Sequence, residues 1–129
     1  MEIRGSQPKS PYFCAMPILK TPVSRRELAV SHCGHYQSMC KAVADVGRGR
    51  LAVDAEMHAD LENLLLEAGA AQKDLWGLNL YPEKAGDDFI EYTALINIRP
   101  PGNPSLAVQD PALRERIAAV IKTWVADAF

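Results

Sequence analysis

A very short connection between two apolar runs constrains this chain more than any other feature of its sequence. The runs cover residues 39–46 and 50–53, and only Gly47-Arg48-Gly49 separates them. A glycine-containing turn of this length between two strand-like runs is typical of a β-hairpin. The sequence therefore predicts two paired strands over residues 39–53.

A second pair of strands is predicted further along the chain, over residues 75–81 and 89–99. The run 89–99 has the clearest alternation of apolar and polar residues in the sequence, which indicates a half-buried strand. The intervening residues 82–88 form a polar turn, so we expect this pair to be antiparallel as well. A short strand is also predicted over residues 12–19, at a sheet edge, because Pro17 lacks a backbone donor.

Two helices are predicted from the residues at which they begin. Ser24 and Glu27 have the spacing of a capping box, in which each side chain accepts a hydrogen bond from the backbone of the other residue. This first helix should end near Tyr36. Asp110 followed by Pro111 is typical of a helix start, with an acceptor at the cap and proline in the first turn.

A third helix, between these two, is predicted from its apolar stripe. Asp54 is its expected cap, and Gly69 is the residue expected just past its end. Apolar residues recur at helical spacing in this helix and in the last one. They are Met57, Leu61, Leu64, Leu65 and Ala68, and then Leu113, Ile117, Val120, Ile121 and Trp124.

The pattern of elements predicts an α+β fold in one domain. Strands joined by hairpins and mixed with helices favour a single-layer, mostly antiparallel sheet of four to five strands, with about three helices packed on one face. Residues 12–129 should form this domain. Residues 1–11 contain glycine, serine and two prolines but little that is apolar, so we expect an N-terminal arm.

Charge and cysteine content narrow the classes of function. The net charge is −2 with a pI near 5.9, and no basic patch is evident, so we expect no nucleic-acid partner. No apolar stretch is long enough for a spanning helix, and residues 1–5 lack the apolar region of a secretory signal, so we expect no membrane segment. Three cysteines do not suit a closed disulfide framework, which favours a reduced, cytoplasmic location.

The predicted helix after residue 54 carries candidate catalytic residues. His58 and Glu62 are four residues apart on one flank, and Asp60 lies between them. A histidine and a carboxylate at this spacing can bind a divalent metal, or the carboxylate can orient the histidine as a general base. The alternative is a boundary histidine that is simply satisfied by a helical carboxylate. No metal ligand set and no cofactor are predicted, because this segment supplies too few ligands and the usual nucleotide motifs are absent.

A polar face of the second hairpin is the other candidate site. Asn79 and Tyr81 are expected to lie beside Glu91, Asn97 and Arg99, next to a rigid proline-rich loop. A guanidinium in such a place can bind a carboxylate or phosphate, or it can form an ion pair that fixes the loop. The candidate ligand-binding residues are Asn79, Tyr81, Glu91, Asn97, Arg99, Asn103 and Arg114.

Two short strings in these segments carry a family resemblance. Trp76-Gly77-x-Asn79-x-Tyr81-Pro82 and Ile96-Asn97-Ile98-Arg99-Pro100, with His58-Ala59-Asp60 before them and Asp110-Pro111 with Arg114 after them, resemble a small bacterial family known only as a domain of unknown function. The resemblance covers roughly residues 24–126. It implies no activity, but it directs attention to its motif residues, which include Asp60, Asn79, Asn97, Arg99, Asn103 and Arg114.

These observations support two main hypotheses of function. The first is a small binding or interaction module, a homo-oligomer, whose polar sheet face and Arg99 loop contact a small anionic ligand or a second subunit. The second is a metal-assisted or general-base enzyme that uses His58, Asp60 and Glu62, with Arg99 holding an anionic substrate. A third hypothesis makes the chain one half of a hetero-complex that is clasped by the arm, residues 1–11.

Overall fold

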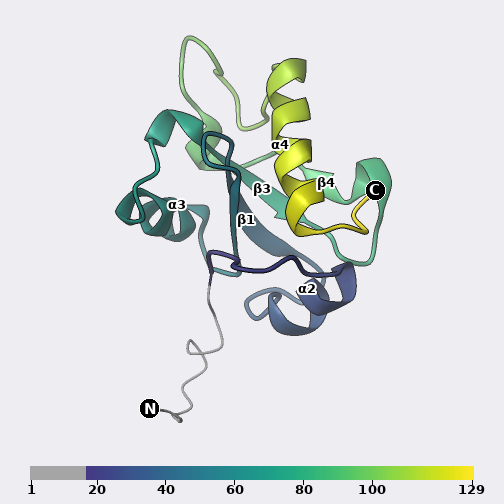
Figure 1. The fold of residues 1–129 in the computed structure, drawn as a ribbon. Helices are drawn as coiled ribbons and strands as arrows, with labels where there is room; N and C mark the ends of the chain where they lie inside the picture. Colours follow the sequence, from purple (N-terminus) through teal and green to yellow (C-terminus); the bar gives the residue numbers. More distant parts are fainter. Residues whose placement is uncertain (1–16) are drawn as a thin grey trace.

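The computed structural model describes residues 17–129, which form one open antiparallel sheet with strand order β2-β1-β3-β4 (Figure 1). The strands are β1 (Cys40–Asp45), β2 (Arg50–Val53), β3 (Leu75–Leu80) and β4 (Ile90–Glu91). The α-helices are α2 (Arg25–Ser31), α3 (His58–Glu67) and α4 (Pro111–Trp124), and three short 3-10 helices are η1 (Gln72–Asp74), η2 (Gly86–Asp88) and η3 (Leu95–Asn97). The predicted α+β class with a four-stranded antiparallel sheet is confirmed.

The hairpin of β1 and β2 forms at the predicted turn, and a buried carboxylate holds it. Asp45 pairs with Arg50 across the ladder. Its carboxylate accepts hydrogen bonds from the Gly47 and Arg48 amides at 3.0 and 3.1 Å, and Arg50 Nη2 lies 3.1 Å away. These bonds satisfy a charged group that is otherwise fully buried. Gly49 has a φ of 68°, a conformation that glycine adopts without strain.

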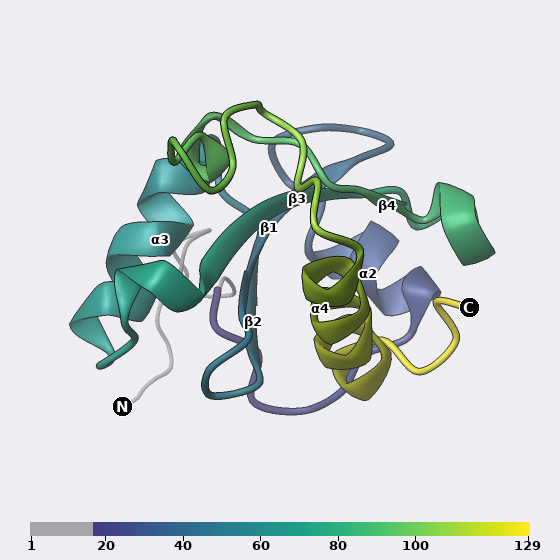
Figure 2. The same ribbon diagram turned by 90° about the horizontal axis from the view of Figure 1, so that it is seen from above.

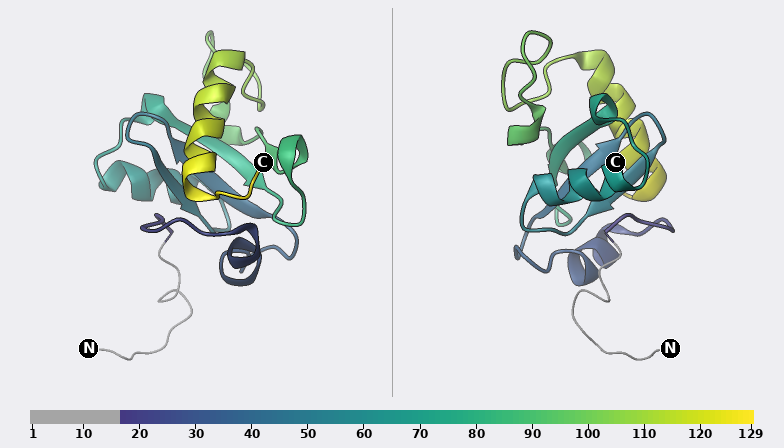
Figure 3. Two further views of the ribbon diagram at one scale, coloured as in Figure 1. Left: turned by 45° about the vertical axis from the view of Figure 1, so that its right-hand side comes forward. Right: turned by 90° about the vertical axis from the view of Figure 1, so that its left-hand side faces the viewer.

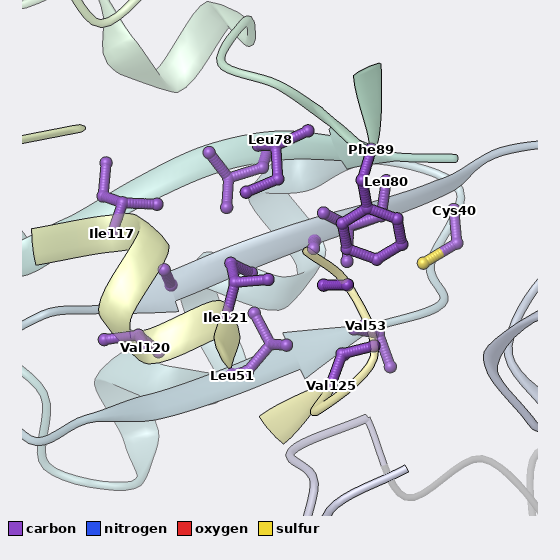
Figure 4. Packing of buried hydrophobic residues seen from close by; sticks show 14 of the residues in the cluster. Cys40, Leu51, Val53, Leu78, Leu80, Phe89, Ile117, Val120, Ile121 and Val125 are labelled. Atoms are coloured by element: carbon purple, nitrogen blue, oxygen red, sulfur yellow. The ribbon is translucent and has the colours of Figure 1, made fainter. Parts of the chain in front are cut away.

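Helices cover both faces of the sheet, which differs from the predicted packing on one face. Figure 2 shows α3 on one side and α2 with α4 on the other, and the views in Figure 3 agree. The helix α4 buries Ile117 and Ile121 against one face (Figure 4). Leu28 of α2 belongs to the same core cluster. In the other layer, α3 buries Leu61 and Leu65.

The reason is visible in β1, which is apolar at consecutive positions. Ala42 and Ala44 pack in the α2 and α4 layer, whereas Val43 packs under α3. Successive side chains of a strand point to opposite faces, so a continuous apolar run must be covered on both sides. The sequence prediction gave too little weight to this run.

The helix starts were predicted with mixed success. The Ser24 and Glu27 side chains each accept a backbone hydrogen bond from the other residue at 3.0 Å, so the capping box is confirmed, although α2 ends at Ser31 and not near Tyr36. Asp110 caps α4 by accepting from the Ala112 amide at 3.0 Å.

Asp54 does not cap α3, so that prediction is wrong. Asp54 has a φ of 71°, and its carboxylate accepts a hydrogen bond from the Gly34 amide at 3.1 Å and lies 3.2 Å from His35 Nδ1. The helix begins at His58, where Met57 is the cap residue and supplies no side-chain acceptor. Gly69 follows the helix with a φ of 97°, as expected for a residue just past a helix end.

The most regular strand pattern of the sequence, residues 89–99, does not form a long strand. Only Ile90 and Glu91 pair with β3, at Leu80 and Asn79. The chain then leaves the ladder, and Asn97 sits in η3 with its side-chain amide against Gly77 of β3. Its Oδ1 accepts from the Gly77 amide at 2.8 Å, and its Nδ2 donates to the Gly77 carbonyl at 3.0 Å. The side chain thus makes the two hydrogen bonds that a neighbouring strand would make.

Gly77 allows this close approach because it has no side chain. A Cβ at this position would clash with Ala94 Cβ and lie 3.1 Å from Ile96 Cγ1. The alternating pattern of the segment predicted a strand, but close packing over Gly77 and the buried Asn97 amide replace regular pairing there. Phe89, Ile90 and Ala94 of this segment are still buried, whereas Leu95 and Ile98 are exposed.

At the other edge of the sheet, Ile18 forms a single antiparallel bridge with Ala52, which agrees with part of the predicted edge strand over residues 12–19. Residues 12–16 of that strand and the predicted arm, residues 1–11, lie outside the described residues. None of the helices within residues 17–129 combines the length and the apolar character needed to cross a membrane.

We expect Asn97→Ala to lower the free energy of unfolding by about 2–4 kcal/mol, because it leaves two buried backbone groups of Gly77 without partners. Urea unfolding followed by circular dichroism measures this change. Asn63→Ala is the matched control, since Asn63 is exposed on α3 and its loss should change stability by less than about 0.5 kcal/mol. Equal stability of the two variants would contradict this role of Asn97.

Candidate functional site

A row of polar side chains crosses the α3 side of the sheet, beyond the part that α3 covers. Lys41 of β1 pairs with Asn79 of β3, and Asn79 pairs with Glu91 of β4. Glu91 Oε1 accepts hydrogen bonds from Asn79 Nδ2 at 2.8 Å and from the Tyr81 hydroxyl at 3.1 Å. The structure therefore brings together three of the predicted ligand-binding residues, Asn79, Tyr81 and Glu91.

A cavity of about 360 Å³ lies at the Lys41 and Asn79 end of this row. The start of α3, the strands β1 and β3 and the turn η3 line this half-open cavity, and most of its lining is apolar. Its lining residues are Met39, Lys41, Met57, His58, Ala59, Asn79, Ala94, Leu95 and Ile96. We name this cavity the α3 cavity.

The amide of Asn79 has an orientation that its neighbours fix. Nδ2 donates to Glu91 Oε1 at 2.8 Å and to the Thr93 carbonyl at 3.3 Å, and both of these oxygens can only accept. The other atom of the amide is therefore the oxygen. Asn79 Oδ1 is buried, and among the described residues it has no hydrogen-bond partner. Buried polar atoms without partners are uncommon in folded proteins, so this oxygen marks a place where a donor is missing.

His58 is the first residue of α3 and is 9 % exposed. Its Nε2 lies 2.8 Å from the Leu78 carbonyl, which can only accept, so Nε2 carries the proton. In the neutral ring Nδ1 is then an acceptor. Burial lowers the pKa of His58; the hydrogen bond to the Leu78 carbonyl raises it in part, the positive charge of Lys41 lowers it, and the neighbouring Asn79 side chain raises it slightly. The net effect of this site is to favour the neutral ring over the charged one.

The N-terminus of α3 is open toward the same cavity. Met57 offers no side-chain acceptor, and within residues 17–129 the backbone amides of His58 and Ala59 have no hydrogen-bond partner. Unpaired amides at a helix start give this end a partial positive charge. The Lys41 ammonium lies nearby in the sheet row, 5.3 Å from the centroid of the Tyr36 ring.

The predicted catalytic carboxylates do not join His58. Asp60 is exposed, and Glu62 is half-buried on the side of α3 near Arg99, where its charge opposes the lowering of the Arg99 pKa by burial. His58 instead donates its Nε2 hydrogen bond to the Leu78 carbonyl of β3. Within residues 17–129, no group of three or more His, Cys, Asp or Glu side chains is arranged to hold a metal ion.

Arg99 lies away from this polar row, because the strand that should have carried it there ends at Glu91. Its guanidinium donates to the carbonyls of Ile96 and Gln72, both at 3.1 Å, and to that of Leu75. The guanidinium carbon lies 4.1 Å from the centroid of the Trp76 ring. Three backbone bonds and one stacked ring hold this side chain in place. Its predicted ligand-binding role stays a prediction.

Two further predicted residues, Asn97 and Asn103, are buried within the same loop. Asn103 Nδ2 donates to the carbonyls of Asn97, Ser105 and Ala107 at 2.9–3.0 Å, and its Oδ1 accepts from the Gln109 amide at 3.0 Å. This amide thereby links backbone groups of residues 97, 105, 107 and 109. The geometry of Asn97 and Asn103 is that of residues that hold the loop.

Arg114 lies on the other side of the molecule, on α4. Its Nε donates to the Val108 carbonyl at 2.6 Å, and its guanidinium carbon is 4.6 Å from the centroid of the Tyr92 ring. It lines a separate cavity of about 290 Å³ together with Asp87 and Phe129. Arg114 therefore does not share a cavity with Asn79.

Lys41 is the polar lining residue of the α3 cavity that the sequence analysis does not predict as a site residue. The sequence carries a signal for it, since Lys41 is a single cation inside the otherwise apolar run Cys40–Ala44. A charged residue in a strand that is covered on both faces must lie where the cover ends. That inference needs the two-sided packing, which the sequence prediction lacked.

Comparison with family models matches residues 17–124 to a family described as "Protein of unknown function (DUF5674)". The chain belongs to this family. The predicted resemblance to a family of unknown function is thereby confirmed. Searches of the curated proteins and of the solved structures found no significant match. The family description assigns no function to this DUF5674 protein, so its function must be inferred from the α3 cavity.

The lowered pKa of His58 makes the stability of this DUF5674 protein depend on pH. The ordinary pKa of 6.5 applies to the unfolded chain, so the unfolded chain takes up this proton first as the pH falls. The stability that the neutral ring contributes is therefore present above about pH 6.5 and is lost as the pH falls toward the folded pKa.

We expect the urea midpoint of the unchanged protein to fall more steeply from about pH 8 to about pH 5 than that of His58→Gln. Glutamine keeps an N–H donor for Leu78 but does not titrate. His32, whose pKa burial also lowers, is present in both proteins, so the difference reports on His58. Parallel curves would contradict the assignment of a depressed pKa to this residue.

Proposed function

We propose that this protein is a small-molecule binding module whose ligand occupies the α3 cavity. The observation that carries the proposal is a mostly apolar cavity whose lining includes Lys41, a cation that forms no ion pair with a carboxylate within residues 17–129. Asn79, another lining residue, is one of the residues predicted from the sequence to bind a ligand.

The composition of the cavity supports the same function. Small-molecule sites are mostly apolar, with a few polar groups that fix the orientation of the ligand, and about 300–1,000 Å³ is their usual size. The α3 cavity, at about 360 Å³, is at the small end of this range. Met57 and Leu95 in its lining are 54 % and 73 % exposed, so apolar surface remains available to a ligand.

The general-base alternative has less support in the same geometry. It needs a carboxylate that orients His58, whereas His58 bonds the Leu78 carbonyl, and Asp60 and Glu62 lie elsewhere. His58 Nδ1 remains an acceptor beside the cavity, which suits ligand recognition as well as proton transfer. We therefore place His58 in the binding site and assign it no catalytic step.

The proposal keeps the predicted binding module but moves its centre from the Arg99 loop to the α3 cavity. Assembly as a homo-oligomer and a cytoplasmic location remain predictions from the sequence. Light scattering coupled to size-exclusion chromatography measures the assembly directly, and a monomeric mass would count against the homo-oligomer.

The test is a fragment screen of the full chain by two-dimensional NMR, with small aromatic and branched aliphatic fragments that carry a hydroxyl or an amide. We expect fragments to shift the resonances of His58, Asn79 and Leu95. Ala59→Leu adds three carbon atoms inside the cavity lining and should weaken these fragments at least about tenfold, which corresponds to about 1.4 kcal/mol.

Ala119→Leu is the matched control, because it makes the same change at an exposed position of α4. This variant should bind the fragments as the unchanged protein does. Fragments that bind away from the α3 cavity, or that bind Ala59→Leu unchanged, would contradict the proposed site.

A further inference from the structure

The two cysteines that the structure describes, Cys33 and Cys40, are neighbours in space, and both carry free thiols. Cys33 follows the end of α2, and Cys40 is the first residue of β1, where it pairs with Leu80 of β3. Figure 4 shows Cys40 at one end of the core cluster, and Cys33 packs against this cluster. The Cys40 thiol donates a hydrogen bond to the Cys33 sulfur. The fold therefore brings the two sulfurs into contact, which is the geometric condition for a disulfide between them.

The chain between the two cysteines is short and irregular. Only residues 34–39 separate them, and none of these residues belongs to a helix or a strand. The segment is anchored from outside, because the Asp54 carboxylate accepts from the Gly34 amide at 3.1 Å and the Tyr36 hydroxyl donates to the Glu56 carbonyl at 2.8 Å. Neither anchor uses a sulfur. A disulfide here would close a small loop whose two ends the folded chain already holds together.

The two thiols differ in exposure and in acidity. Cys33 is partly exposed, so a small molecule can reach its sulfur, whereas Cys40 is 1 % exposed. The hydrogen bond from Cys40 lowers the pKa of Cys33, against the opposing effects of burial and of the negative charges of Asp54 and Glu83. The same hydrogen bond, together with burial, raises the pKa of Cys40. Since the thiolate is the reactive form of cysteine, Cys33 is the attacking thiol of the two.

We propose that Cys33 and Cys40 are a redox-active dithiol pair, in which Cys33 reacts with a small disulfide such as glutathione disulfide and Cys40 completes an intramolecular disulfide. Neither cysteine lines the α3 cavity, so this reactivity is separate from the proposed ligand binding.

The reaction consists of two thiol–disulfide exchanges. The Cys33 thiolate first attacks one sulfur of the small disulfide, which forms a mixed disulfide and releases one thiolate. Cys33 then carries no charge, so it no longer holds the proton on Cys40. Cys40 loses this proton to solvent and attacks the Cys33 sulfur, which releases the second half of the small molecule as a thiolate. The protein pair is oxidised to a disulfide, and the small disulfide is reduced to its two thiols.

The test incubates the reduced full chain with glutathione disulfide, alkylates the remaining thiols and analyses tryptic peptides by mass spectrometry. Both cysteines lie in one tryptic peptide, residues 27–41. We expect this peptide to escape alkylation and to become lighter by one pair of hydrogen atoms, with glutathione on Cys33 only as a transient species. Dithiothreitol should return the peptide to its reduced form.

Single substitutions by serine separate the two roles. Cys40→Ser should accumulate the mixed disulfide of Cys33 with glutathione, because no second thiol resolves it. Cys33→Ser should leave Cys40 unmodified, because this thiol is buried. Cys14→Ser is the matched control, since it makes the same change at the remaining cysteine, which lies outside the described residues. This control should form the disulfide between Cys33 and Cys40 as fast as the unchanged protein does.

A second measurement determines whether the fold promotes the bond. At a fixed ratio of glutathione to its disulfide, the ratio of oxidised to reduced pair should be at least about tenfold higher in the native protein than in urea. A lower ratio in the native protein would overturn the proposal. So would an unreactive Cys33, a mixed disulfide that persists on Cys33 in the unchanged protein, or a bond that joins Cys14 to Cys33 instead.

Discussion

The contact between the Asn97 amide and the backbone of Gly77 governs the arrangement of the sheet edge. A side-chain amide carries one acceptor and one donor group with the spacing of a peptide unit, so it can replace a paired strand at one residue. Asn97 does this at 2.8 and 3.0 Å, and its second Nδ2 hydrogen bond, to the Leu106 carbonyl at 3.1 Å, ties the next loop to the same point. Glycine at position 77 is required because Ala94 and Ile96 press directly on it.

The α3 cavity exists because the Asn97 side chain takes the place of a paired strand beside Gly77. Since the chain leaves β3 after Glu91, the segment that follows packs over the sheet as η3 instead of extending it. Helix α3 covers the sheet from the other end, above Val43 and Ala52. The strip with Lys41 and Asn79 lies between the two covers and stays open. Its polar residues are therefore found where two packed layers fail to meet, which is where a charged side chain is tolerated within a buried strand.

Local signals in the sequence predicted the local structure, and long-range contacts decided the rest. The turn at Gly49 and the capping box at Ser24 involve residues within a few positions of each other, so a single sequence contains all the information they need. The segment 89–99 has the alternating pattern of a strand. Whether it forms one depends on its packing against Gly77, which is twelve or more residues away in the sequence. Asn79, Tyr81 and Glu91 were placed together because their two strands do pair at this point. Arg99 lies beyond the last pair, where the predicted register no longer applies.

Residue type alone was a poor guide to which polar side chain is available for a ligand. Arg99 is the strongest anion binder of the predicted set by its chemistry, yet three backbone carbonyls and Trp76 occupy it. Asn79 is a weaker group by its chemistry, but after Glu91 and Thr93 have fixed its nitrogen, its oxygen remains unpaired in a buried position. Whether a polar side chain is free to bind a ligand depends on the whole hydrogen-bond network of the folded protein. Buried backbone groups need partners, and side chains such as Arg99 supply them. Which side chains remain for a ligand is therefore known only when the tertiary contacts are in place, and in the α3 cavity the charged one is Lys41.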